Sequence, residues 1–206
     1  MPRNGIRPAL LVAGALILIL GAGCAVTPTG PAAFTVTPEP SLPLTARGLQ
    51  PGLAVHYFEH KFVRHLDDLP SAEVVQEKGW SGPAVPYLNH QFGRGEVFDS
   101  GTNRGIAMEL NGFIRLDRAG TYGFQANTND GFRLFIDGQL LIEDPSWHSD
   151  RLSPEALVVV TDPGWYAVHI RYFQRKGTST LQLYWKPPQE ASFSIVPARV
   201  LAHRAS

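Results

Sequence analysis

The chain has one cysteine, few charged side chains and no long helical pattern. Cys24 is the only cysteine in 206 residues, so a disulfide within the chain is excluded. Lysine and arginine together number 18, as do aspartate and glutamate, and no basic run occurs. The sequence therefore lacks the charge pattern of a nucleic-acid-binding protein. Apart from Ser71–Lys78, which predicts at most two helical turns, no segment has a sustained helical period.

Alternation of apolar and polar residues is the pattern that the sequence does have. It runs through residues 122–127, 166–173 and 181–185. A period of two marks strands that bury mainly one face, as in an antiparallel sandwich or barrel. The side chains that this parity places in the core are Phe124, Leu134, Ile136, Val168, Ile170, Leu183 and Trp185, together with Tyr122, Trp165 and Tyr166.

Asp137-Gly138, between the apolar runs FRLFI and QLLIE, is the strongest hairpin signal. A type I′ turn needs positive φ at both central residues, which Asp and Gly tolerate. A two-residue turn with an unbroken register places Phe132 opposite Glu143 and Gly131 opposite Asp144. The count therefore gathers polar residues at the end of the sheet away from the turn: Asn129, Asp130, Asp144, Trp147 and His148.

Two of these residues have both a functional and a structural interpretation. Asp130 binds a ligand, or it only hydrogen-bonds nearby backbone where a loop meets a strand. Trp147 lies in a polar context, PSWHSD, so its indole is either an exposed platform that stacks on a sugar or a cover for the sandwich edge.

No catalytic centre is expected. The seven histidines show no metal-ligand spacing, and no Ser–His–Asp or carboxylate pattern marks a reacting centre. We therefore assign no catalytic residue and expect a protein that is not an enzyme.

The stretch GTYGFQANTNDGFRLFIDGQLLIED, followed by PGWYAVHIRYF, resembles the protective-antigen (PA14) family of β-domains. The family's usual phrase is Gly-x-Tyr-x-Phe, then Asp-Gly-x-x-Leu-x-x-Asp-Gly, then Gly-x-Tyr. The likeness covers roughly Leu49 to His203, and Ile106 to Trp185 is its most specific part. One departure is Met108-Glu109-Leu110, where the family often has an aromatic residue. The resemblance implies an all-β fold, a two-sheet antiparallel β-sandwich, in a family found in surface proteins and usually linked to carbohydrate binding.

The same resemblance bears on calcium. In the fungal flocculation adhesins of this family, two consecutive Asp residues hold a calcium ion that contacts sugar hydroxyls, and an Asn in a later loop completes the site. This chain has Asn129, Asp130 and Gln174 at those positions. Calcium affinity rises with ligand charge, and Lys176 repels a cation, so a calcium site formed by Asp130 and Asn129 is expected to be weak or absent. The carbohydrate-binding candidates are Asn129, Asp130, Asp144, Trp147 and Gln174.

The N-terminus has the pattern of a secretory signal peptide. Arg3 and Arg7 precede an apolar run, 9–20, which is short for a membrane span and is followed by Gly21-Ala22-Gly23-Cys24. This end resembles a bacterial lipobox, although Gly21 stands where Leu is usual. We expect residues 1–23 to be removed and Cys24 to carry lipid, with ordinary secretion or an uncleaved anchor as alternatives. In a bacterium with two membranes, Ala25 rather than Asp after the cysteine favours the outer membrane of the cell envelope.

Residues 24–47 are rich in Pro and Thr and have little to bury, so they predict an extended tether. Residues 48–203 form one domain that is large enough for a core. The sequence therefore favours a lipid-anchored, non-catalytic module that binds a glycan or an envelope polysaccharide. The alternative is a structural or protein-interaction scaffold of the envelope.

Overall fold

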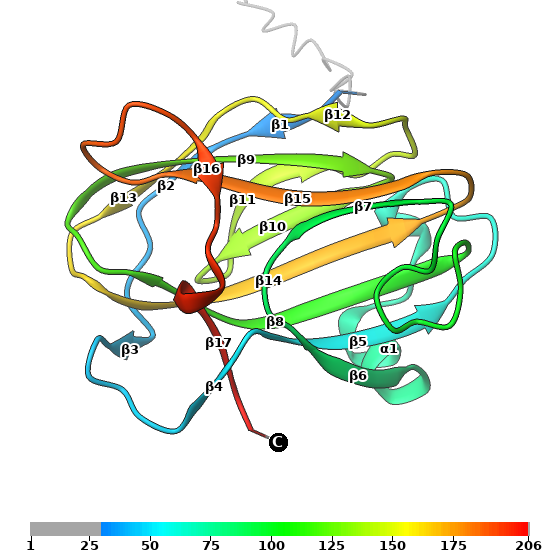
Figure 1. Ribbon diagram of the computed structural model, residues 1–206, viewed down its shortest axis with the longest axis horizontal. Helices are drawn as coiled ribbons and strands as arrows, with labels where there is room; N and C mark the ends of the chain where they lie inside the picture. The colour runs from blue at the N-terminus through cyan, green and yellow to red at the C-terminus, as the bar shows by residue number, and fades with distance from the viewer. Residues whose placement is uncertain (1–29, 206) are drawn as a thin grey trace, which may run out of the picture.

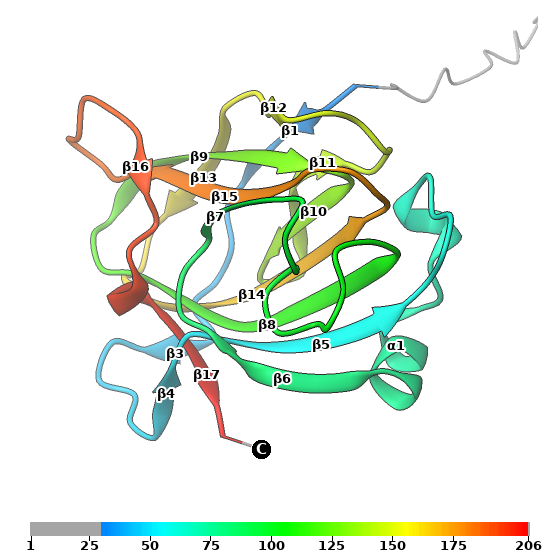
Figure 2. The ribbon, with the colours of Figure 1, turned by 45° about the vertical axis from the view of Figure 1, so that its right-hand side comes forward.

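The computed structural model describes residues 30–205, which form two facing β-sheets (Figures 1 and 2). The central strands of both sheets come from the segments whose residues alternate in polarity. The larger sheet has ten strands in this region, with the order β1 (Ala32–Ala33), β11 (Gln139–Asp144), β10 (Phe132–Ile136), β14 (Gly164–Gln174), β8 (Ile106–Leu116), β17 (Leu201–Arg204) and β4 (Leu49–Pro51). Also in this sheet, β3 (Leu42–Pro43) pairs with β14, while β5 (Leu53–Glu59) lies between β8 and β6 (Trp80–Val85).

The smaller sheet has seven strands in the described part of the chain, with the order β16 (Ser194–Ile195), β15 (Ser179–Lys186), β9 (Gly120–Asn129), β13 (Ala156–Val160) and β2 (Thr35–Val36). In addition, β12 (Arg151–Leu152) pairs with β9, and β7 (Asn89–Gly93) pairs with β15. The pair β2–β13 is parallel, and the long central strands are antiparallel. The helical elements are α1 (Ala72–Lys78) and the 3-10 turns η1 (Leu66–Asp68) and η2 (Ala198–Val200).

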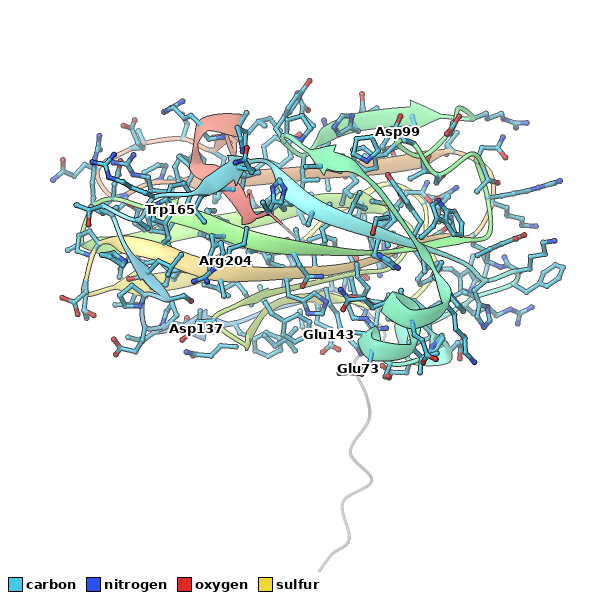
Figure 3. All side chains as sticks on the ribbon, turned by 90° about the horizontal axis from the view of Figure 1, so that it is seen from below. Glu73, Asp99, Asp137, Glu143, Trp165 and Arg204 are labelled. Carbon is cyan, nitrogen blue, oxygen red and sulfur yellow. The ribbon has the colours of Figure 1, made fainter. Side chains whose placement is uncertain are left out.

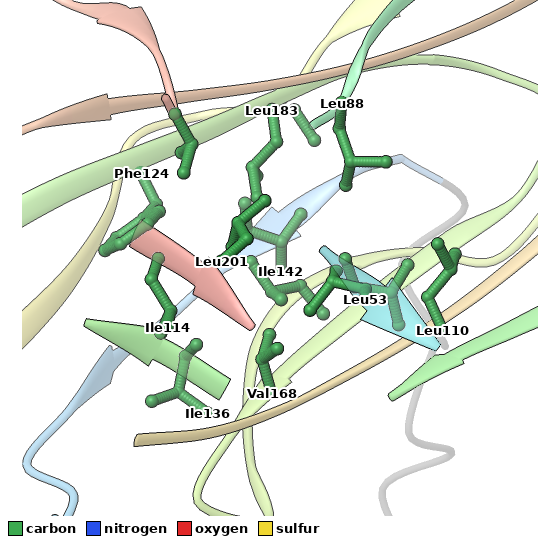
Figure 4. Close-up of a cluster of buried hydrophobic side chains, with 14 of the residues drawn as sticks. Leu53, Leu88, Leu110, Ile114, Phe124, Ile136, Ile142, Val168, Leu183 and Leu201 are labelled. Atoms are coloured by element: carbon green, nitrogen blue, oxygen red, sulfur yellow. The ribbon is translucent and has the colours of Figure 1, made fainter. Parts of the chain in front are cut away.

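The core lies between the sheets and follows the alternation in the sequence. In β14, Tyr166, Val168, Ile170 and Tyr172 are buried, whereas the residues between them are only partly buried. Figure 4 shows apolar side chains from both sheets meeting in this layer, such as Phe124 and Ile136. All ten side chains that the sequence places in the core are buried, so this prediction is confirmed.

The Asp137-Gly138 turn forms as predicted, with φ values of 49° and 73°, but the register beyond it differs from the count. The strands β10 and β11 contain a bulge next to Leu134 and Phe135, where Leu141 is the extra residue. Asp144 therefore pairs with Phe132, and the prediction that it faces Gly131 was wrong by one residue. The physical reason is that a bulge sets two residues against one, so Leu141 and Ile142 are both buried.

The predicted tether needs a correction where the structure describes it. The strands β1, β2 and β3 pair with β11, β13 and β14, and Val36 lies in the core. Ser41 accepts a hydrogen bond from the Ala167 amide at 3.0 Å. Residues 32–43 thus belong to the sandwich, because short apolar stretches between the prolines form short strands that pair with the two sheets. The predicted signal peptide, 1–23, and Cys24 lie outside the described residues. Within residues 30–205, no helix is long and apolar enough to cross a membrane.

Candidate functional site

The predicted polar residues lie at one end of the sandwich, where three strands end. Strand β9 ends at Asn129, β11 at Asp144 and β14 at Gln174 (Figures 1 and 2). The pairings of Phe132 with both Asp144 and Tyr172 hold these ends together. Asp137 lies towards the opposite end, as does Trp165 near the start of β14, whereas Asp99 lies towards the end where the three strands finish (Figure 3).

Asp130 is a buried junction between two loops. Its Oδ1 accepts a hydrogen bond from the His148 backbone amide at 3.1 Å, and its Oδ2 accepts one from the Arg175 amide at 2.8 Å. The residue is only 4% exposed. Burial raises the pKa of the Asp130 carboxyl, and the two amide donors offset this effect only in part. The structure thus shows Asp130 holding backbone, which is the structural interpretation of this residue.

Asn129 is also buried and is hydrogen-bonded within the protein. Its side-chain amide donates to Asp150 at 2.8 Å and to the Thr178 hydroxyl at 3.3 Å. Its carbonyl accepts a hydrogen bond from the Tyr172 hydroxyl at 2.5 Å, and its peptide bond to Asp130 is cis. The Thr180 hydroxyl donates to the other oxygen of Asp150 at 2.9 Å. Asn129 therefore joins the loop before β12 to the loop before β15.

Asp144 forms a buried ion pair. Arg151 binds it through both Nε, at 2.7 Å from Oδ2, and Nη2, and His148 Nε2 lies 3.1 Å from Oδ2. Burial by itself would raise the pKa of Asp144, but Arg151 and His148 outweigh that effect, so the pKa of this carboxyl lies below its ordinary value. Asp144 thus fixes the loop between β11 and β12.

Gln174 is fully buried and donates a hydrogen bond to the Thr178 carbonyl at 3.1 Å. The structure brings it to the same end as Asn129, Asp130 and Asp144, as predicted. However, these four residues are at most 6% exposed, which does not support a shallow polar site lined by them. Their role in sugar binding stays a prediction. The physical reason for their burial is that their side-chain hydrogen bonds hold the loops at this end.

Trp147 is the predicted site residue that faces solvent, with 53% of its surface exposed. Its backbone amide donates to the Arg64 carbonyl at 2.9 Å. The guanidinium carbon of Arg175 lies 5.0 Å from the centre of the indole ring, which is a cation–π distance. We call the surface formed by Arg64, Trp147, Arg175 and Lys176 the Trp147 rim.

Arg64, Arg175 and the exposed Phe62 in the loop before Arg64 were not predicted from the sequence. Phe62 is 80% exposed in the loop after β5, with a positive φ of 69°. Arg64 and Arg175 come from loops 111 residues apart in the sequence. A Phe between Lys61 and Arg64 outside any alternating run was the available signal for an exposed aromatic. Nothing in the spacing indicated that Arg175 would meet Trp147.

A metal site needs several ligands in one place, and the described residues do not provide one. Within residues 30–205, no three His, Cys, Asp or Glu side chains gather as metal ligands. Asp130 accepts hydrogen bonds at both oxygens, and Asp144 is paired with Arg151. A calcium ion at Asp130 and Asn129 would have to replace these bonds.

A sandwich of this topology, with its loops fixed by buried polar residues, corresponds to a known domain. The family model of the PA14 domain matches residues 86–198, more than half of the chain. The chain belongs to the PA14 domain family. No curated protein sequence matches it.

Solved structures share the PA14 fold with this chain at low sequence identity. An anti-sigma factor domain-containing protein is 19% identical with a TM-score of 0.62, and the match covers 76% of this chain and 48% of that one. This chain thus spans about half the length of that protein. The PA14 sugar-binding domain from an RTX adhesin is 18% identical, with a TM-score of 0.57 and coverage of 74% and 98%. The Epithelial Adhesin 9 A domain from Candida glabrata, in complex with Galb1-4GlcNAc, is 12% identical, with a TM-score of 0.58 and coverage of 82% and 97%.

Proposed function

We propose that this PA14 domain is a non-catalytic carbohydrate-binding module and that it binds sugar at the Trp147 rim. The observation that carries the proposal is the half-exposed Trp147 indole, which the buried Asp130 junction fixes in place through the next residue, His148. A rigid aromatic face in water suits the apolar C–H face of a pyranose ring. The sugar-binding adhesin domains that share the fold support this choice.

The rim offers hydrogen-bond donors beside the stacking surface. Arg175 lies over Trp147, and Lys176 is the next residue in the same loop; their N–H groups suit the hydroxyl and ring oxygens of a sugar. The buried carboxylates then serve to shape the loops, and the sugar contacts come from Trp147 and its neighbours. This arrangement needs no calcium ion.

A glycan array with the purified full-length chain tests the proposal. We expect hits that weaken at least about tenfold in the Trp147→Ala variant, as when a central aromatic contact is removed from an interface. Trp80→Ala is the matched control, because it removes another partly exposed indole, on β6, outside the rim. Equal binding by the Trp147→Ala and Trp80→Ala variants would place the sugar elsewhere.

A structural or protein-interaction role is the second candidate. The observation in its favour is that Asp130 and Asp144 are fully used in holding the loops. An array without any hit, together with capture of an envelope protein that is lost in a Phe62→Ala variant, would favour this role.

We further propose that the protein works at the bacterial cell envelope, anchored in the outer membrane by lipid on Cys24 after removal of residues 1–23. The support is the sequence pattern of residues 3–24 and Ala25 after the cysteine. The lipid bilayer would then be a partner of the N-terminus and a glycan the partner of the rim.

A further inference from the structure

The accessible charge around Trp147 is positive. Arg175 and Lys176 lie in one loop, and the Arg64 carbonyl accepts the Trp147 amide. Arg104 lies next to them, because the amide of the following residue, Gly105, donates to the Arg175 carbonyl at 3.1 Å. Within residues 30–205, none of these four cations has a carboxylate oxygen within 4.0 Å as an ion-pair partner, whereas Lys61 nearby is paired with Glu59.

The acidic residues at this end do not neutralise that charge. Asp130 is buried under two backbone amides, and Asp144 is buried against Arg151. Among the exposed acids at this end, Asp68 accepts the Arg64 amide at 3.1 Å, Asp150 binds Asn129 and Thr180, and Asp67 is paired with Arg133. Arg64, Arg175 and Lys176 of the rim, and Arg104 beside it, form no ion pair in the described part of the chain, so the charge that they leave accessible is positive.

Arg175 is arranged so that a ligand can use it. Its guanidinium carbon lies over the Trp147 indole, 5.0 Å from the ring centre. The Arg175 Nε is buried without an acceptor in the part of the chain that the structure describes, so an incoming acidic group would bind the Nη atoms of this partly exposed residue. A planar carboxylate, sulfate or phosphate group is the acceptor that suits a guanidinium edge.

We propose that the saccharide bound at the Trp147 rim is anionic and carries uronate, sulfate or phosphate groups. This proposal rests on the proposed function and specifies its substrate class. One sugar ring stacks on the indole of Trp147, while an acidic group on it or on the next ring meets Arg175 and Lys176. The positive rim attracts polyanions over a Debye length of about 8 Å at physiological salt.

Matched pairs of polysaccharides test the charge preference with the full-length chain. Polygalacturonate is compared with its methyl ester, and dextran sulfate with dextran, so that each pair shares a backbone and differs in charge. We expect the anionic member to bind at least about tenfold more tightly, with affinity falling as salt is raised from 0.1 M to 0.5 M.

The variants show whether the preference belongs to the rim. Arg175→Gln with Lys176→Gln should weaken polygalacturonate binding about tenfold, since two accessible charge contacts are lost. Arg47→Gln with Arg199→Gln is the matched control, because it removes the same charge from two exposed residues outside the rim. Equal loss in both double variants would show only an effect of net charge and would overturn the proposal.

The remaining outcomes separate this inference from the function on which it rests. If neutral and anionic polymers bind alike, with a loss only in the Trp147→Ala variant, the rim binds sugar and the charge preference is wrong. If no polysaccharide binds, the proposed function fails as well. Binding to phosphatidylglycerol vesicles without binding to any polysaccharide would show that the cations meet lipid headgroups and would overturn the proposal.

Discussion

The guanidinium of Arg175 and the indole of Trp147 lie on each other, and one buried carboxylate holds both of their loops. The Arg175 carbon is 5.0 Å from the ring centre, and Asp130 accepts the backbone amides of Arg175 and of His148, the residue after Trp147. Asp130 is thus a positioning residue: it stays buried and fixes the loops that carry Arg175 and Trp147.

Asp130→Asn should therefore weaken sugar binding without removing a sugar contact. The asparagine side chain has one acceptor oxygen for two backbone donors, so one buried backbone N–H loses its partner. This loss costs about 1–3 kcal/mol in the free energy of unfolding. Urea unfolding and a titration with the best array ligand measure both effects. Asp162→Asn, on an exposed turn, is the control. Unchanged stability and affinity would mean that other contacts hold the two loops.

Ile170→Ala should destabilise the fold by about 2–5 kcal/mol, as deletion of a large core side chain does in general. Ile170 is fully buried between the sheets. Urea unfolding of this variant is compared with Val159→Ala, which shortens a partly exposed side chain on β13 and should cost about 1 kcal/mol or less. A near-neutral result for Ile170→Ala would contradict the burial of this strand face.

The alternation in β14 shows why so much of the fold was predictable. Side chains such as Val168 and Ile170 repeat with the period of a strand, and that period is a local property of the chain. The Asp137-Gly138 turn is likewise local, because positive φ at both positions is set by residue type. The bulge at Leu141 is different, since Leu141 and Ile142 both lie in a core formed with residues distant in the sequence, which no local pattern records.

The candidate site was predictable in position but not in character. The hairpin brought Asp130 and Asp144 to one end, and Trp147 was recognisable from its polar context. The partners that bury the carboxylates, Arg151 for Asp144 and the Arg175 amide for Asp130, depend on how separate loops meet. For the same reason, the sequence indicated a tether where Val36 enters the core.

Arg151→Met should destabilise the protein at neutral pH and much less in acid. The variant leaves Asp144 buried without its main cation, and we expect the free energy of unfolding to fall by roughly 2 kcal/mol. This loss is smaller than the roughly 3–5 kcal/mol typical of fully buried pairs, because the Arg151 side chain is 32% exposed.

The pH dependence follows from the lowered pKa of Asp144 in the folded wild type. A lowered folded pKa contributes stability that is present above the unfolded pKa of about 3.9 and is lost as pH falls through the folded pKa. Thermal unfolding of the wild type and of Arg151→Met is measured between pH 7 and pH 3. The difference between their melting temperatures should narrow below about pH 4. A gap that stays constant would mean that charge pairing at Asp144 does not stabilise the fold.

Calcium should give no measurable heat when it is titrated at millimolar concentration into the full-length chain. Asp130 and Asn129 provide one carboxylate between them, whereas calcium favours six to eight oxygen ligands, and Lys176 repels a cation. Calorimetry with and without prior chelation measures this. A micromolar site that Asp130→Ala abolishes would show that the replacement of Asp by Asn129, and of Asn by Gln174, does not prevent calcium binding.

Cys24→Ala should move the protein from the membrane fraction to the soluble fraction. The reason is that a lipid attached to this single cysteine would be the anchor. Metabolic labelling with palmitate should mark the wild type and leave Cys24→Ala unlabelled. Ala25→Asp is the matched control: it should keep the lipid label, because the cysteine is intact, but shift the protein from the outer to the inner membrane. Full membrane association of unlabelled Cys24→Ala would show that the apolar run 9–20 remains as an uncleaved anchor.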